Sequence, residues 1–295
     1  DMIKFFKKLI LMFKFFNKVN FILLKVFFIK FLFFSNFINS HELWIEPKKY
    51  FFEDNEFVIA NIKVGQMFEG INLGYFPRSF ARFDFFSNNN LMPINGIIGD
   101  NPAINFLNKN HGLGIIIYQT NNEYLYYDDW KKFESFVYDK NLDNILKTHL
   151  KNKFPKDDFV EIYKRYTKSI IAFKNYKGKD RNFGMETEFV LQNNYFENKK
   201  KEIKIKLFYK LKPRKNVQVE IFEKNEKNEV KFSKIFTDNL GIVNFTIKPG
   251  YTYLLNSVVM RRYKKNDIIK DISPNNSKVL WESLWASITF KVPKN

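Results

Sequence analysis

The chain has no cysteine among its 295 residues. This absence excludes a disulfide framework, a thiolate metal site and a cysteine nucleophile. Histidine is almost as scarce, because only His41, His111 and His149 occur. Any chemistry that needs an imidazole therefore depends on one of these three positions.

Sequence signatures of the common enzyme classes are missing as well. The chain contains no Gly-x-Ser-x-Gly, no phosphate-binding P-loop, no His-Glu-x-x-His and no glycine-rich dinucleotide turn. Two carboxylate pairs, Asp128-Asp129 and Asp157-Asp158, stand at predicted helix starts, where N-capping explains them. The sequence therefore predicts a protein that is not an enzyme.

Acidic residues are outnumbered, since 49 Lys and Arg against 31 Asp and Glu give a net charge of +18. Residues 1–40 hold seven lysines and one aspartate, so they carry +6 and the rest of the chain carries +12. The lysines are scattered among acidic residues, and the aromatic residues fall on core-facing positions. A nucleic-acid interface needs a basic face with exposed aromatic residues, so we expect no nucleic-acid partner.

A long hydrophobic run is also absent, because no stretch of about 20 uninterrupted apolar residues occurs. We therefore expect no stable membrane span in the mature chain. Residues 1–34 instead mix lysines with Phe, Leu and Ile, and a short polar stretch ends at Ser40. This pattern is typical of an export signal with its cleavage region, starting at Met2 or Met12. It predicts a signal peptide over residues 1–40 and a protein of the periplasm.

The leader has a second interpretation. Lysines within its apolar part weaken an export signal, because a charge at the centre of a helix costs about 2.5 to 3.5 kcal/mol. On a helix, five lysines fall on one stripe: Lys4, Lys7, Lys14, Lys18 and Lys25. In this alternative the leader is an amphipathic helix that is never removed and tethers the protein to a membrane.

If cleavage follows Ser40, His41 becomes the first residue of the mature protein. Its α-amine and imidazole then form a bidentate nitrogen chelator for a late transition metal, with Glu42 as a supporting ligand. His111 would complete a three-nitrogen site suited to Cu(II) or Ni(II) if it lay beside His41; otherwise it caps a turn. In the simplest alternative, His41 is a tolerated residue at the start of an edge strand.

The mature chain is predicted to be mainly β, with two antiparallel β-sandwich domains over 41–127 and 185–295. Three apolar or alternating runs predict strands of the first domain: Glu56–Val64, Phe80–Phe86 and Gly114–Thr120. Runs separated by Gly, Pro and Asn, at spacings typical of a sandwich, predict the second domain: Glu202–Phe208, Val217–Phe222, Ile242–Ile247, Tyr251–Met260 and Trp281–Val292.

Residues 128–184 are predicted to be a helical insert between the two β regions. Asp128-Asp129 would cap a first helix, and apolar residues between Leu142 and Leu150 would form a second. A third helix is expected after Pro155, with its apolar face formed by Phe159, Ile162, Tyr163, Tyr166 and Ile170. His149 would lie near the end of the second helix, where the helix dipole favours a protonated ring.

The tryptophans offer a different candidate site. Trp281 and Trp285 share one face of the last predicted strand, while Glu282 lies on the other. We expect these indoles, and Trp44 in the first strand, to fill the core, and Glu282 to pair with an arginine such as Arg261. If they lie at a surface instead, they would bind a carbohydrate or a surface partner.

Four motifs in order resemble a bacterial family over most of the mature chain. They are His-Glu-Leu-Trp at 41–44, the Phe-Glu-Gly turn at 68–70, the pair Lys-Phe-x-x-Phe at 132–136 and Tyr-x-Arg-Tyr-x-Lys at 163–168, and Trp-Glu-Ser-Leu-Trp-Ala-Ser-x-Thr-Phe at 281–290. The sequence looks like the domain-of-unknown-function family known as NikM-like, a periplasmic component of nickel and cobalt uptake. Thr237–Gly241 and Gly250-Tyr251 also resemble a transthyretin-like or carboxypeptidase-regulatory β-sandwich.

The resemblance implies a binding or accessory protein that captures nickel or cobalt and hands it to a transporter of the inner or outer membrane. Relatives tend to carry a histidine in the strand that matches residues 257–260, where this chain has Val258-Val259. The alternative of a different class is a β-sandwich that binds a carbohydrate or a surface partner without metal. In neither case does the chain catalyse a reaction.

Overall fold

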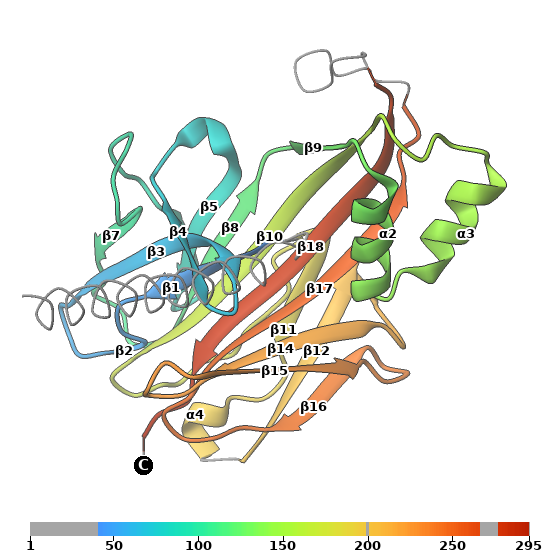
Figure 1. The fold of residues 1–295 in the computed structure, drawn as a ribbon. Coiled ribbons are helices and arrows are strands. Elements are labelled where there is room, and N and C mark those ends of the chain that lie inside the picture. The colour runs from blue at the N-terminus through green and yellow to red at the C-terminus, as the bar shows by residue number, and fades with distance from the viewer. Residues whose placement is uncertain (1–40, 199–200, 266–276, 295) are drawn as a thin grey trace, which may run out of the picture. The chain divides into compact units, whose positions relative to one another are not determined.

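The computed structural model describes residues 41–198, 201–265 and 277–294. These residues belong to one compact unit, shown in Figure 1. The predicted signal peptide at 1–40 lies outside the described residues. Strands make up most of the described chain, which confirms the predicted mainly-β fold.

A ten-stranded sheet forms the centre of the fold. Its main path runs β15-β14-β17-β18-β10-β8-β5-β6, and two further strands, β2 and β9, pair with β10. The bounds are β2 Phe51–Phe52, β5 Phe80–Ser87, β6 Asn90–Pro93, β8 Gly112–Thr120, β9 Glu123–Tyr127, β10 Phe159–Phe173, β14 Gln218–Lys224, β15 Val230–Phe236, β17 Thr252–Arg262 and β18 Val279–Lys291. The long strands β10 and β18 run parallel, side by side, through its middle (Figure 1).

Two smaller sheets are built from the remaining strands. The first contains β1 Glu42–Pro47, β3 Phe57–Gln66, β4 Glu69–Leu73 and β7 Ile104–Leu107. The second contains β11 Thr187–Leu191, β12 Glu202–Tyr209, β13 Lys212–Pro213 and β16 Ile242–Thr246. Both are antiparallel.

The two small sheets cover opposite faces of the central sheet. Successive side chains of a strand point to opposite faces, and β8 separates the two cores in this way. Ile115 and Ile117 pack in the core of the β11–β16 sheet, whereas Ile116 packs in the core of the β1–β7 sheet. The result is a three-layer sandwich that crosses the predicted domain boundaries at 127 and 185.

Strand β1 is the edge strand of its sheet, and its free edge lies across β10 and β18. Hydroxyl groups of the central sheet satisfy its carbonyl groups. Thr167 and Ser287 donate to the Leu43 carbonyl at 3.0 and 2.6 Å, and Thr289 donates to the Ile45 carbonyl at 2.8 Å. Because buried carbonyl groups need partners, these hydroxyls fix β1 against the central sheet.

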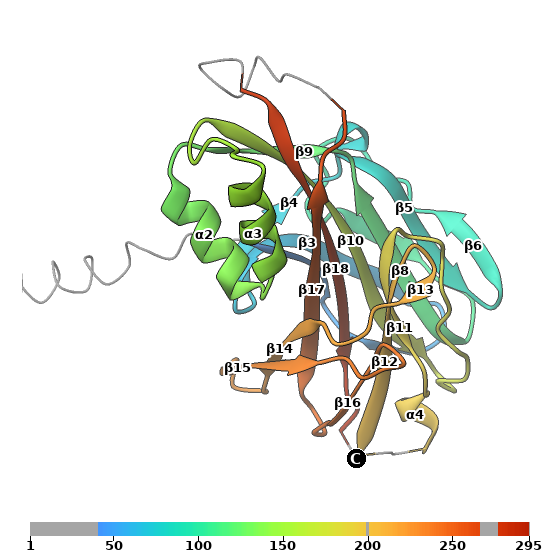
Figure 2. The same cartoon turned by 90° about the vertical axis from the view of Figure 1, so that its right-hand side faces the viewer.

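Two of the three predicted helices are confirmed. Helix α2 spans Trp130–Asp139, with the Asp129 carboxylate accepting from the Lys131 amide at 2.9 Å, and α3 spans Asp143–Lys151. Both helices lie together beside β17 and β18 (Figures 1 and 2). A 3₁₀ turn at Pro77–Ser79 and a short helix α4 at Tyr195–Asn198 complete the helical elements of the described residues.

The third predicted helix is wrong, because Phe159–Phe173 forms strand β10. This strand is covered on both faces, and nearly all its residues are buried. A strand that is buried on both faces does not alternate between apolar and polar residues, so a helical spacing can be found in it by chance. Asp158, expected near a helix start, precedes the strand and accepts a hydrogen bond from the Tyr126 hydroxyl.

No helix in the described ranges is long and apolar enough to cross a membrane.

Candidate functional site

The chain enters the described fold at His41, immediately before β1. Glu42 pairs with Gly65 and Leu43 with Val64 in the ladder between β1 and β3. Beyond this ladder, Met67 and Phe68 both adopt positive φ angles of 53° and 61°, which form the tight turn predicted at the Phe-Glu-Gly motif. The Phe68 ring packs on Trp44 with centroids 6.0 Å apart, so the hairpin and β1 support each other.

Arg165 on β10 holds the His41 backbone in place. Its Nη2 donates to the His41 carbonyl at 3.2 Å, and its Nη1 pairs with Glu123 at 3.0 Å. The guanidinium also lies over the Tyr163 ring, 4.6 Å from its centroid. His41 therefore starts an anchored strand while its side chain remains exposed.

Partial burial of the ring, and then the positive charge of Arg165, lower the pKa of His41. The imidazole is therefore neutral at neutral pH, and one of its nitrogens carries a free lone pair. A neutral imidazole is the form that binds transition metals.

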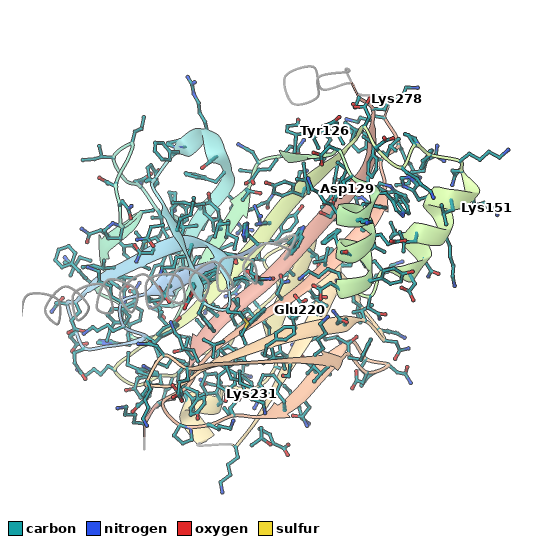
Figure 3. All side chains as sticks on the ribbon, in the orientation of Figure 1. Tyr126, Asp129, Lys151, Glu220, Lys231 and Lys278 are labelled. Carbon is teal, nitrogen blue, oxygen red and sulfur yellow. The ribbon has the colours of Figure 1, made fainter. Side chains whose placement is uncertain are left out.

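The Glu42 side chain points the opposite way, into a buried ionic cluster of Glu42, Lys140 and Glu220. Lys140, at the end of α2, has its Nζ 2.8 and 2.9 Å from the two Glu220 oxygens and 3.4 Å from Glu42 Oε1. Asn256 donates to Glu220 at 2.7 Å. Figure 3 labels Glu220 on β14, near the lower end of α2.

The cluster holds two carboxylates against one ammonium group. Burial raises the pKa of Glu42 to about 7, and the neighbouring charge of Glu220 adds to this shift, while Lys140 opposes it. Burial alone would lower the pKa of Lys140, but the charges of Glu220 and Glu42 raise it. Glu42 therefore exchanges a proton near neutral pH, and as a metal ligand it would have to turn away from Lys140.

A second buried carboxylate lies close by on β10. Glu161 accepts hydrogen bonds from the Tyr127 hydroxyl at 2.8 Å and from the Ser283 hydroxyl, which in turn accepts from the Trp285 indole at 2.9 Å. Burial raises the pKa of Glu161 to about 7. This residue was not identified from the sequence, because a glutamate in a predicted helix carries no signal of burial.

His111 lies far from His41. Its Nδ1 is 3.0 Å from Asp54 Oδ1, and the next residue, Gly112, pairs with Phe173 at one end of the β8–β10 ladder. His41 contacts Arg165, eight residues earlier on β10, which corresponds to about 26 Å along a strand. The structure therefore does not bring the two histidines together in a three-nitrogen site.

The third histidine has a structural role. His149 lies in the last turn of α3, where its Nδ1 accepts from the Trp281 indole at 3.0 Å and its Nε2 is 2.8 Å from the Pro155 carbonyl. Burial lowers the pKa of the ring. The neutral form is therefore favoured, in contrast to the protonated form expected from the helix dipole.

The tryptophan candidates are buried. Trp44, Trp281 and Trp285 are at most 6% exposed, and the last two pack under α2 and α3. Glu282, on the other face of β18, accepts from Arg261 Nε at 2.7 Å. None of these three indoles presents a ring face to a ligand at the surface.

Within the described ranges, no group of three or more His, Asp or Glu side chains is arranged to hold a metal ion. The nitrogen donors of His41 are therefore the remaining metal-binding candidate from the sequence. They would act as a bidentate pair that leaves the other coordination positions to water or to a partner.

Comparison with known proteins places the chain in a family. No curated protein matches it. Residues 38–261 match the family described as Domain of unknown function (DUF4198). This match covers the His-Glu-Leu-Trp motif, the helical region and most of the central sheet. The chain therefore belongs to the DUF4198 family.

Proposed function

We propose that this protein is an exported binding protein that captures a divalent transition metal ion through His41. In this proposal a signal peptidase cleaves after Ser40 in the periplasm, and the new α-amine and the His41 imidazole chelate the ion. Nickel or cobalt is the ion suggested by the NikM-like resemblance, and copper is the alternative. The ion is then passed to a metal transporter of the inner or outer membrane, without catalysis.

One observation carries the proposal: an exposed, neutral histidine begins a strand whose backbone is firmly held. The hydrogen bond from Arg165 fixes this residue through its carbonyl group, and so uses neither its amide nitrogen nor its imidazole. Arg165 is itself paired with Glu123 at 3.0 Å, which reduces its repulsion of a cation. A preorganised chelator loses less conformational entropy when it binds.

The coordination chemistry makes a prediction about metal order. A site with two nitrogen donors from one residue follows the general order Cu(II) above Ni(II) above Co(II) in affinity. Uptake of nickel or cobalt would then depend on which metal the transporter accepts. The alternative, a carbohydrate or surface-partner site formed by tryptophans, has less support because those side chains are buried.

The first test is the intact mass of protein purified from the periplasm, which shows whether the chain begins at His41. Thermal melts with Ni(II), Co(II), Cu(II) and Zn(II) then compare the wild type with His41→Ala. We expect at least one metal to raise the melting temperature of the wild type and to have no effect on His41→Ala. A leader that is still attached would contradict the proposal and favour the membrane-tethered alternative.

Two controls isolate the chelate. His111→Ala removes the other exposed histidine and should respond to metal like the wild type. A chain that starts at Ser35 keeps the His41 imidazole but moves the α-amine six residues away, so it should lose most of the response. If His111→Ala loses the response and His41→Ala keeps it, the proposed site is wrong.

A further inference from the structure

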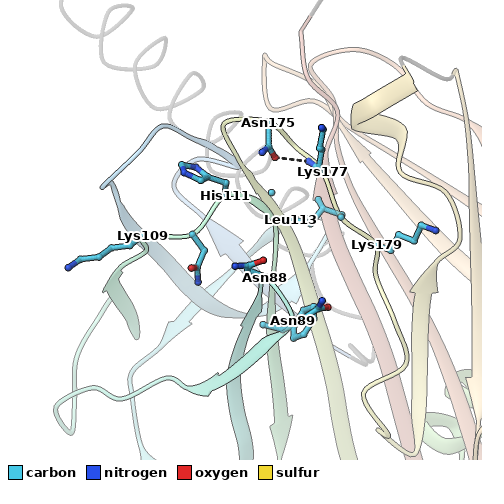
Figure 4. Close-up of a pocket in the computed structure, with 12 residues that line it drawn as sticks. Asn88, Asn89, Lys109, His111, Leu113, Asn175, Lys177 and Lys179 are labelled. Carbon is cyan, nitrogen blue, oxygen red and sulfur yellow. Dashed lines mark hydrogen bonds between the residues drawn. The ribbon is translucent and has the colours of Figure 1, made fainter.

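A cleft of about 540 Å³ lies at the end of the fold that carries His111. Figure 4 shows that it is bordered by the turn between β5 and β6, the segment before β8 and the segment after β10. This basic cleft is lined by Phe86, Asn88, Asn89, Lys109, Asn110, His111, Gly112, Leu113, Asn175, Lys177, Gly178 and Lys179. Its size is within the range of sites for small ligands.

The first wall of the basic cleft is a tight turn. Asn88 and Asn89 adopt positive φ angles of 49° and 60°, a conformation that asparagine tolerates in hairpin turns. Arg181 donates to Asn89 Oδ1 at 2.7 Å and lies over the Phe86 ring, 4.2 Å from its centroid. The Arg181 side chain, from the segment after β10, therefore fixes this turn.

The opposite wall is fixed by its backbone. The Leu113 amide donates to the Lys177 carbonyl at 2.7 Å, and a Cβ on Gly112 would lie 2.3 Å from that oxygen. Glycine is therefore required where the two segments meet. Asn194 donates to the Tyr176 and Gly178 carbonyls at 2.8 and 3.0 Å. The segment that carries Lys177 is therefore held by Leu113 and by Asn194.

The charge of the basic cleft is one-sided. Its lining residues include three lysines, one histidine and four asparagines, but no aspartate or glutamate. In the described part of the chain, Lys109, Lys177 and Lys179 form no ion pair. The nearby Asp54 is shared by His111 and Lys174 at 3.0 and 2.5 Å. The rim of the cleft therefore carries positive charge that no acidic side chain of its lining pairs with, around a set of asparagine amides (Figure 4).

We propose that the basic cleft binds an acidic saccharide. Ammonium groups pair with carboxylate or sulfate groups, and asparagine amides can both donate to and accept from sugar hydroxyls. A single-stranded nucleic acid fits less well, because bases need an exposed aromatic ring to stack on. The only Phe, Tyr or Trp in the lining, Phe86, is 6% exposed and is covered by Arg181. This proposal is independent of metal binding at His41.

The test measures binding of tetragalacturonate to residues 41–295 by isothermal titration calorimetry. Maltotetraose, which is neutral, and an eight-residue oligothymidylate are the comparison ligands. We expect binding of tetragalacturonate alone, and a weaker affinity as salt rises. Replacement of two cleft lysines, Lys177→Gln with Lys179→Gln, should weaken binding about tenfold or more.

The matched control replaces two exposed lysines on α3, Lys147→Gln with Lys151→Gln; Figure 3 shows Lys151 on that helix. This variant loses the same charge and should bind like the wild type. Equal weakening in both variants, or equal binding of the oligothymidylate, would mean a general attraction of anions and would overturn the proposal. Absence of tetragalacturonate binding to the wild type at low salt would also overturn it.

Discussion

At the scale of single residues, the structure buries two carboxylates with raised pKa values, Glu42 on β1 and Glu161 on β10. Glu42 lies beside the Lys140 ammonium group, whereas Glu161 accepts hydrogen bonds from Tyr127 and Ser283, and the pKa of each carboxylate is raised to about 7. Carboxylates with such pKa values are often found at functional sites, although structural networks produce them too. Here they predict that the stability of the fold depends on pH.

Glu161 gives the clearest prediction, because burial is the largest cause of its pKa shift and no lysine or arginine in the described ranges forms a salt bridge with it. Its pKa is about 7 in the folded protein against 4.5 for the free group, so folding favours the protonated form. This stabilisation is complete below pH 4.5 and is lost as the pH rises through 7, for a total of roughly 3 kcal/mol. Glu161→Gln should therefore be less sensitive to pH between 4.5 and 8 than the wild type.

Urea unfolding at pH 4.5, 6 and 8 measures this difference. Glu69→Gln, at an exposed position of β4, is the control and should follow the pH dependence of the wild type. An unfolding free energy of Glu161→Gln that falls with pH as steeply as that of the wild type would show that Glu161 is not the titrating group.

At the scale of elements, the positions of most strands could be predicted from the sequence, but the strands with which they pair in the sheets could not. The alternation in Glu202–Phe208 correctly predicts β12, which has one buried face. The run Val217–Phe222 correctly predicts β14, although this strand is buried on both faces. Strand β10 escaped prediction because both its faces are buried. Strand pairing depends on contacts between distant parts of the chain, which local periodicity does not encode.

The candidate site shows the same limit. The motif at His41 is visible in the sequence because it follows the predicted export signal, and His41 is exposed in the structure. The partners of Glu42 were missed because Lys140 and Glu220 lie far away in sequence. Nothing in the local sequence of either residue distinguishes it from a solvated surface charge.

The contact between β1 and the central sheet leads to the second prediction at this scale. The Thr289 hydroxyl donates to the Ile45 carbonyl at 2.8 Å and is fully buried. Thr289→Val keeps the shape of the side chain but leaves that carbonyl without its donor, which costs about 1 to 3 kcal/mol. We expect a lower unfolding free energy in urea and faster amide hydrogen exchange in β1.

Thr246→Val is the matched control. Thr246 is the exposed last residue of β16, so its replacement should change the unfolding free energy by less than about 0.5 kcal/mol. An equal effect of both substitutions would indicate that the Thr289 hydroxyl does not support β1.

At the scale of the whole described unit, the central sheet joins the two β regions. Strand β10, from the predicted insert, pairs with β8 of the first region and β18 of the second. One hydrophobic core includes Ile115 and Ile117 together with Tyr253 and Leu255. The two regions therefore share both hydrogen bonds and buried apolar surface.

This sharing predicts a single cooperative unfolding transition for residues 41–295. If 41–127 and 185–295 were independent sandwiches, calorimetry would resolve two transitions, or a calorimetric enthalpy well above the van't Hoff value. We expect the two enthalpies to agree. We also expect residues 185–295 alone to fail to fold. Strand β18 would lose the hydrogen bonds that it forms with β10, and apolar side chains that now pack against residues 41–184 would be exposed to water. A folded fragment with its own sharp transition would show that the shared sheet joins two domains that are each stable alone.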